Sequence, residues 1–301
     1  MTTFKTTPTR ARARVSAPAR RPAGKYLVIV FMVVALGYFL TPLIWLVLSS
    51  TKSNADLFNT FGFWFSPRFN LFQNLNDLFA RDNGAYVTWM KNTVIYAISA
   101  SVGSALISAL AGYAFALYRF AGRNLLFGIV LASVFVPSTV FAVPLFLLLA
   151  KSGLSNTLLA IILPALVNPF GVYLMRIYAE QAVPEELLDA ARVDGAGDFR
   201  IFAQISFRLL APGFVTVLLF AFVGAWNNYF LPLLVLSKSS LYPVTVGLAY
   251  WNSLAAQPGN ATVLYAIVIT GSVVAILPVM FAFLFLQRYW QGGLSLGSVK
   301  G

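Results

Sequence analysis

Long apolar runs that contain no charged side chain dominate the pattern of this chain. Each run is bounded by lysine or arginine, and together they cover 26–51, 92–118, 124–150, 152–175, 209–237 and 239–287. A helix needs about 20 apolar residues to cross the hydrocarbon core of a bilayer. Each of the first five runs therefore predicts one membrane-spanning helix.

The sixth run is too long for one span, and its first part is polar. The stretch 239–261 predicts a loop because it carries Pro243, Asn252, Gln257, Pro258, Gly259 and Asn260. A last helix is expected at roughly 262–286. Prolines within the spans, including Pro137, are expected to kink or break them. The predicted fold class is an all-α polytopic membrane protein with six transmembrane helices.

The composition supports lipid as the main solvent and removes several kinds of chemistry. Apolar residues make up 59% of the chain and charged residues only 10%, whereas soluble domains carry roughly 25% charged residues. Cysteine and histidine are absent, so disulfides, thiolate metal sites and the usual proton relay are excluded. We expect no cofactor and no metal.

The cations indicate the orientation. If the N-terminus is inside, 15 of the 21 lysines and arginines fall on the cytoplasmic side, as the positive-inside rule requires. Both termini are then cytoplasmic, and the net charge of +12 reflects topology, with no nucleic-acid partner. Residues 1–25 are predicted to be a basic disordered tail; an organelle transit peptide is the alternative that the composition allows.

The outer segment 49–88 is unusually aromatic. Its aromatic residues are Phe58, Phe61, Phe63, Trp64, Phe65, Phe69, Phe72 and Phe79. Such a density is typical of a segment lying along the membrane interface. A contact surface for an external partner is the alternative.

The nine acids avoid every predicted span. Asp56, Asp77 and Asp82 lie in the outer segment, and the other six fall within 19 residues, from Glu180 to Asp198. Ion-driven carriers normally bind their ion through ionisable groups inside the membrane, although sodium can use backbone carbonyls. The pattern thus disfavours an ion-coupled secondary carrier. A membrane-embedded enzyme or assembly factor is a further alternative, but no paired acids supply chemistry for it.

The sequence lacks the phosphate-binding pattern G-x-x-x-x-G-K-[ST]. If transport uses ATP, a separate ATPase must therefore hydrolyse it.

The acidic loop 181–212 predicts a helix–turn–helix at the cytoplasmic surface. Pro184 suits a first helical turn, and Glu185 and Glu186 suit the positive end of the helix dipole. Gly195 is expected to end this helix in a left-handed conformation. A second amphipathic stretch follows, with helical spacing of Phe199, Phe202, Ile205 and Leu209.

The same loop closely resembles the EAA loop of ABC importer permeases, in particular the MalG-like carbohydrate permeases. Asp189-Ala190-Ala191, Gly195 and Ile205 stand at the family spacing, with Pro184, Glu186, Leu187, Asp194 and Ala196 around them. Two positions depart from the pattern. Asp189 replaces the family's glutamate, and Arg208 stands where a proline is frequent.

The resemblance covers about 88–301 and favours sugars as substrates. It includes Trp226-Asn227-Asn228, PLLVL at 232–236, PVTVGL at 243–248 and the ending QRYWQGGLSLGSVKG. It implies the type I ABC importer permease fold, with a permease domain at 88–287. A first transmembrane helix and external amphipathic loop at 26–87 precede this domain, and a cytoplasmic tail at 288–301 follows it.

The resemblance also implies a role and partners. The chain would be a non-catalytic permease of a bacterial or archaeal plasma (inner) membrane. It would work with a second homologous permease, two ABC ATPase subunits and an extracytoplasmic sugar-binding protein. The residues implied in ATPase coupling are Glu186, Asp189, Ala190, Ala191, Asp194, Gly195 and Ile205.

Polar and aromatic residues in or beside the spans are candidates for a sugar path. The candidates are Trp226, Asn227, Asn228, Tyr229 and Asn92. Amides and aromatic rings can hydrogen-bond and stack on a sugar. The alternative is hydrogen bonding between helices, which is common for asparagine in membrane bundles.

Overall fold

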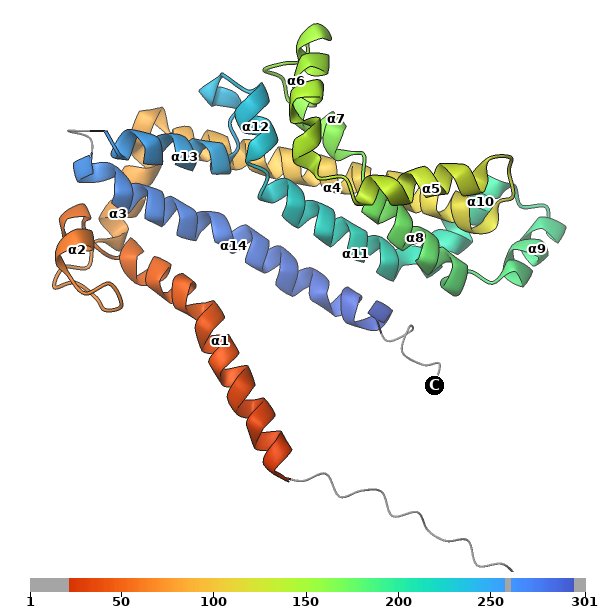
Figure 1. Cartoon of the computed structure of the whole chain (residues 1–301), viewed down its shortest axis with the longest axis horizontal. Coiled ribbons are helices and arrows are strands. Elements are labelled where there is room, and N and C mark those ends of the chain that lie inside the picture. The colour runs from red at the N-terminus through yellow and green to blue at the C-terminus, as the bar shows by residue number, and fades with distance from the viewer. Residues whose placement is uncertain (1–21, 258–260, 295–301) are drawn as a thin grey trace, which may run out of the picture. The chain divides into compact units, whose positions relative to one another are not determined.

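The computed structural model describes residues 22–257 and 261–294, and its regular elements there are all helical (Figure 1). The chain divides into two units, Met1–Trp45 and Leu46–Gly301. The elements are α1 Pro22–Ser50, α2 Asn54–Asn59, α3 Leu71–Ala80, η1 Arg81–Asn83, α4 Ala85–Leu117, α5 Arg123–Val134, η2 Ser138–Phe141, α6 Ala142–Lys151, α7 Leu159–Ala165, α8 Pro169–Ala182, α9 Glu185–Val193, α10 Asp198–Ile201, η3 Phe202–Ser206, α11 Phe207–Trp226, α12 Phe230–Val235, η4 Ser239–Leu241, α13 Val244–Ala255 and α14 Ala261–Leu294.

In the first unit, the described residues form most of α1, which is apolar on every side. Large side chains such as Phe31, Val34 and Tyr38 are exposed all around it. A helix that is hydrophobic all round suits a lipid environment. The predicted basic tail lies mostly outside the described residues, as do the side chains of the predicted C-terminal tail.

The prediction of six spans agrees with the helices, with one span broken. In the described part of the chain, five helices are long and apolar enough to cross a membrane: Gly24–Ser50, Ala85–Leu117, Leu159–Ala182, Asp198–Trp226 and Leu264–Gln287. The sixth candidate is a pair, Arg123–Val134 and Ser138–Lys151, bent by 98°. The single helix expected at 124–150 was therefore wrong, and the break falls at Pro137, where a disruption was predicted.

Other boundaries also differ from the expectation. The fifth helix occupies Asp198–Trp226 instead of 209–237, so it begins inside the loop predicted at 181–212. The loop expected at 239–261 contains α13, because Pro243 serves as its N-cap and the helix, although it includes Asn252, is mostly apolar. The last helix, expected near 262–286, is confirmed as the greater part of α14, which continues to Leu294.

The centre of the second unit is α4, which packs along α8 and α11. The middle of its buried face is a row of small residues: Ala97, Ala100, Ser101, Ser104, Ala105, Ser108, Ala109 and Gly112. A Cβ on Gly112 would stand 2.7 Å from the backbone nitrogen of Arg176 in α8. Small residues permit this close approach, which drives helix association in membranes.

Candidate functional site: the α9 loop and a cavity beside α11

The helix α9 is bounded by local sequence chemistry. Pro184 was expected in the first turn and is instead the N-cap, one position earlier, and Glu185 and Glu186 occupy the first turn. Gly195 adopts φ +79°, which confirms the predicted left-handed stop. The amide N–H groups of Gly195 and Ala196 donate to Arg192 O and Ala191 O, both at 3.0 Å. These two bonds form a Schellman cap.

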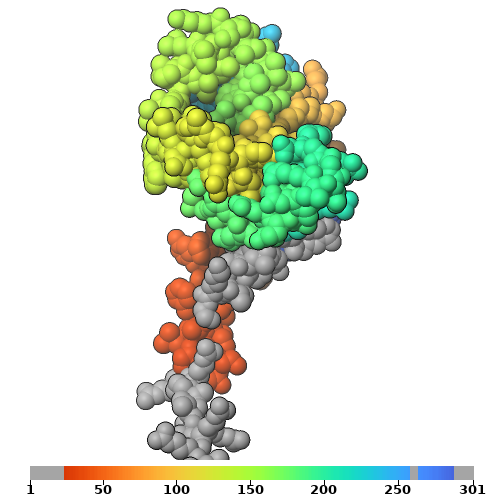
Figure 2. Space-filling view, turned by 90° about the vertical axis from the view of Figure 1, so that its right-hand side faces the viewer, coloured from red at the N-terminus to blue at the C-terminus, as the bar shows by residue number. Residues whose placement is uncertain are grey.

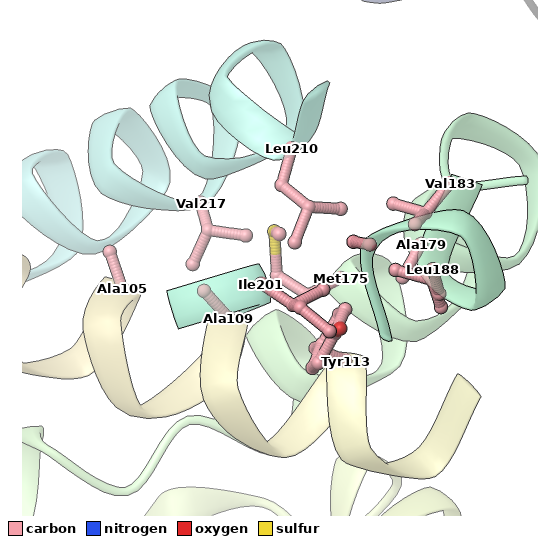
Figure 3. Packing of buried hydrophobic residues seen from close by; sticks show 11 residues of the cluster. Ala105, Ala109, Tyr113, Met175, Ala179, Val183, Leu188, Ile201, Leu210 and Val217 are labelled. Atoms are coloured by element: carbon pink, nitrogen blue, oxygen red, sulfur yellow. The ribbon is translucent and has the colours of Figure 1, made fainter. Parts of the chain in front are cut away.

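The two faces of α9 have different surroundings. Leu188 and Ala191 are buried in an apolar cluster that includes Tyr113 of α4, Met175 of α8 and Leu210 of α11 (Figure 3). The other face is exposed and carries Leu187, Ala190 and Val193, at i, i+3 and i+6, beside Glu186, Asp189 and Asp194. The adjacent alanines thus face opposite ways: Ala191 packs against the chain itself, while Ala190 faces outward.

The second amphipathic stretch buries only part of the predicted face, because Phe202 and Ile205 pack against the apolar cluster whereas Phe199 and Leu209 are exposed. Phe199 is 82% exposed, and the deeply buried residues are Ile201, Ser206 and Leu210. The reason is η3, a π-helical turn at Phe202–Ser206, which inserts a residue and shifts the face that follows. Ile205 is half-buried and packs against the apolar cluster.

Charged groups connect α9 to α10. Arg192 Nη1 lies 3.0 Å from Asp189 Oδ1, and its Nη2 lies 3.7 Å from Asp198 Oδ1. The hydrogen bond to Asp189 raises the pKa of the Arg192 guanidinium. Burial, followed by the influence of Tyr113 and Asp198, raises the pKa of Tyr118 to about 12. Within the described residues, Glu186 and Asp194 have no ion pair, so their charges are free for a partner.

Three of the five residues predicted to line a sugar path surround a cavity of about 440 Å³. Trp226, Asn227 and Tyr229 line it, together with Thr245 and Ser272 from α13 and α14. Trp226 is only 3% exposed, and its indole N–H donates to Ala275 O at 3.2 Å. The ring of Tyr229, in contrast, is 41% exposed and is available for stacking.

The other two candidates are placed differently. The Asn228 carbonyl accepts a hydrogen bond from Thr245 Oγ1 at 2.8 Å. Asn92 is buried and is not among the residues that line the cavity. Its amide donates to Ser240 O at 2.8 Å and to Tyr242 O at 3.0 Å. This is the helix-linking geometry that was the alternative to substrate contact.

Sequence reasoning missed three residues at these sites. Leu188, which anchors α9, could have been found from its three-residue spacing to Ala191. Thr245 and Ser272 had no comparable signal, because they reach the cavity only through the packing of α13 and α14 against α11.

Comparison with known proteins decides the family. Residues 104–292 match the family model described as "Binding-protein-dependent transport system inner membrane component". The chain belongs to this family. As a member, it is a multi-pass membrane protein and a transport component, which confirms the resemblance to ABC importer permeases.

Several relatives of this inner membrane component are permeases named for sugars. The arabinooligosaccharides transport system permease protein AraQ of Halalkalibacterium halodurans is 38% identical over 86% of this chain and 91% of its own length. The lactose transport system permease protein LacG of Rhizobium radiobacter is 32% identical over 91% and 96%.

The fold has a solved counterpart. A chain in the crystal structure of a bacterial ABC transporter involved in the import of the acidic polysaccharide alginate aligns with a TM-score of 0.78 at 24% identity. The alignment covers 91% of this chain and 100% of that one. This likeness supports the all-α importer permease fold.

Proposed function

We propose that this chain is a permease subunit of an ATP-driven, binding-protein-dependent sugar importer. Its partners would be a second homologous permease, two cytoplasmic ATPase subunits and an external sugar-binding protein, in a bacterial or archaeal plasma membrane. The names of AraQ and LacG support a sugar as the substrate class. The family match supports the transport role.

The observation that supports the coupling role is the contrast between the two faces of α9, one buried and one exposed. Its outward face offers Leu187, Ala190 and Val193 with unpaired acids around them, which suits a groove with basic residues in a partner. Its inward face inserts Leu188 among side chains of α4, α8 and α11. A push on α9 by a closing ATPase would therefore reach three membrane helices through one apolar cluster.

The cavity beside α11 is the part of the path that this subunit would contribute. Tyr229 offers an accessible aromatic face, and Asn227 offers an exposed amide whose N–H is shared with Val223 O at 2.9 Å. The neighbouring Trp226 is held in place by the hydrogen bond from its indole N–H to Ala275 O of α14. A sugar ring stacked on Tyr229 and hydrogen-bonded to Asn227 fits this chemistry.

Substitution of Gly195 tests the proposed coupling. A Cβ there would meet nothing within 4 Å, but φ is +79°, so a side chain costs backbone strain alone. Gly195→Val should strain the turn by about 1–2 kcal/mol, spare membrane insertion, abolish sugar transport and weaken copurification of the ATPase. Gly195→Asn is the matched control because asparagine tolerates the left-handed region. Transport by Gly195→Val complexes at the wild-type rate would refute the proposal.

A further inference from the structure

A second, polar cavity of about 300 Å³ lies between α4 and α5. It is lined by Arg119, Phe120, Gly122, Arg123, Asn124 and Leu125. It lies at the α9 end of the bundle, because Arg123 Nη2 is 4.0 Å from Glu180 Oε1, and Glu180 stands in the last turns of α8, just before α9. Figure 2 shows this end, with α5 in yellow beside the green and teal of α8, α9 and α10.

The cavity contains hydrogen-bond donors that the chain leaves unused. Arg123 Nε is buried and has no hydrogen-bond partner, although Nη2 of the same side chain donates to Ala116 O at 3.2 Å. Arg119 is exposed, and the described residues give it neither a hydrogen bond nor an ion pair. A buried donor without an acceptor is costly, and the exposed, unpaired guanidinium of Arg119 is accessible to an anion in the cavity.

Two further features make the cavity attractive to an anion. The facing carboxylate, Glu180, is engaged mainly by Arg176, whose Nε lies 2.8 Å from its Oε1. The helix α5 begins at Arg123 after Gly122, which has no side chain to cap the free N–H groups of the first turn. Those groups and the two guanidinium groups all favour negatively charged oxygen.

The residues around the cavity indicate which kind of molecule supplies the negatively charged oxygen. Beyond the cavity, α5 exposes Leu125, Leu126 and Ile129, and the sequence has no charged residue from Asn124 until Lys151. A polar cavity at the foot of a helix with an exposed apolar face fits a headgroup with its acyl chains lying along that face. Basic pockets on the cytoplasmic side of membrane helices commonly hold such headgroups.

We propose that this cavity binds the phosphate of an anionic phospholipid of the cytoplasmic leaflet. Arg119 and Arg123 contact the phosphate, and Leu125 and Ile129 line the path of the acyl chains. The inference uses the predicted orientation of the chain and is independent of the sugar.

Lipid titration of the purified full complex tests this site. Dioctanoyl phosphatidylglycerol, dioctanoyl phosphatidylcholine and inorganic phosphate are each added, and binding is followed by native mass spectrometry and by the shift in melting temperature. The wild type should prefer phosphatidylglycerol. Arg119→Gln should weaken phosphatidylglycerol binding roughly five-fold, and the double variant Arg119→Gln, Arg123→Gln roughly 25-fold. Each arginine near the membrane surface is expected to contribute a similar factor to the affinity.

Matched variants separate the site from general charge. Arg208→Gln removes one exposed cation at the α9 end but outside the cavity, so it should keep wild-type lipid affinity. Arg119→Lys keeps the charge and should retain most of the binding. Arg119 is the decisive position because its loss breaks no bond within the described chain.

Any of four results would overturn the proposal. Equal affinity for phosphatidylcholine and phosphatidylglycerol would show that the cavity does not bind an anionic headgroup. An unchanged affinity for phosphatidylglycerol in Arg119→Gln would show that Arg119 does not contact the phosphate. Competition by inorganic phosphate at concentrations equal to the lipid would indicate a soluble anion instead. Unchanged lipid binding with loss of the ATPase from Arg119→Gln complexes would make the arginines a protein contact.

Discussion

The two ends of α4 are held by different forces. At its start, hydrogen bonds tie it to the distant segment 239–244: Trp89 Nε1 to Ser239 O at 2.9 Å, Tyr96 Oη to Leu241 O at 2.8 Å and Val244 N to Thr93 Oγ1 at 2.8 Å. At its end, Tyr113 Oη accepts one hydrogen bond from Ser206 Oγ at 3.2 Å, and the contact with α9 is an apolar cluster around Leu188 and Ala191. Within the described residues, no hydrogen bond joins α9 to α4, α8 or α11.

This difference suits a molecule that must be fixed at one end and movable at the other. Hydrogen bonds are directional and fail when their geometry changes, whereas apolar burial is non-directional. We infer that α9 can rock against Tyr113 and Met175 without losing its burial. The start of α4 cannot shift without breaking several bonds at once.

Gly247 should give the largest effect, at the fixed end. A Cβ at this position would overlap the ring of Trp89, which itself packs on Trp251 with ring centroids 4.5 Å apart. Gly247→Ala should therefore destabilise the fold by about 3 kcal/mol or more and reduce the folded yield, measured by size exclusion in detergent. Gly128→Ala, where a Cβ meets nothing within 4 Å, is the control. Equal yields would show that the packing at this end is loose.

Leu188 should give the next effect, at the movable end. Leu188→Ala removes the buried anchor of α9 and should cost about 2 kcal/mol of local packing, because a short surface helix can settle into the space, and it should lower the melting temperature and transport. Leu187→Ala removes the same atoms from the exposed face. It should leave the melting temperature unchanged and weaken ATPase retention instead. Equal melting temperatures for the two variants would show that Leu188 does not anchor α9.

Asp189 should give the smallest effect. Asp189→Glu restores the residue of the family pattern, and the pair with Arg192 is exposed at both ends. Exposed pairs contribute little, so transport should stay within about two-fold of the wild type. Charge reversal by Glu186→Lys should be clearly more damaging. Transport rates in proteoliposomes compare the two.

Local chemistry made α9 predictable, and packing made its neighbours unpredictable. The acids in the first turn and Gly195 act within a few residues, so the sequence indicated the helix and its end. The π-helical turn at Phe202–Ser206 had no local signal, since the packing of Ile201, Ser206 and Leu210 on α4 and α8 selects it. Likewise, the burial of Trp226 depends on Ala275 in α14, so sequence could not tell Trp226 from Tyr229 as the accessible ring.

Cysteine cross-linking tests the central claim, the docking of α9 on an ATPase, most directly. The chain contains no cysteine, so a single introduced thiol reports on one position. Ala190 is exposed and Ala191 is 7% exposed, which makes Ala190→Cys and Ala191→Cys a matched adjacent pair. In the assembled transporter, Ala190→Cys should cross-link to the ATPase and Ala191→Cys should not. Failure of Ala190→Cys to cross-link in an actively transporting complex, or equal cross-linking by both, would contradict the account.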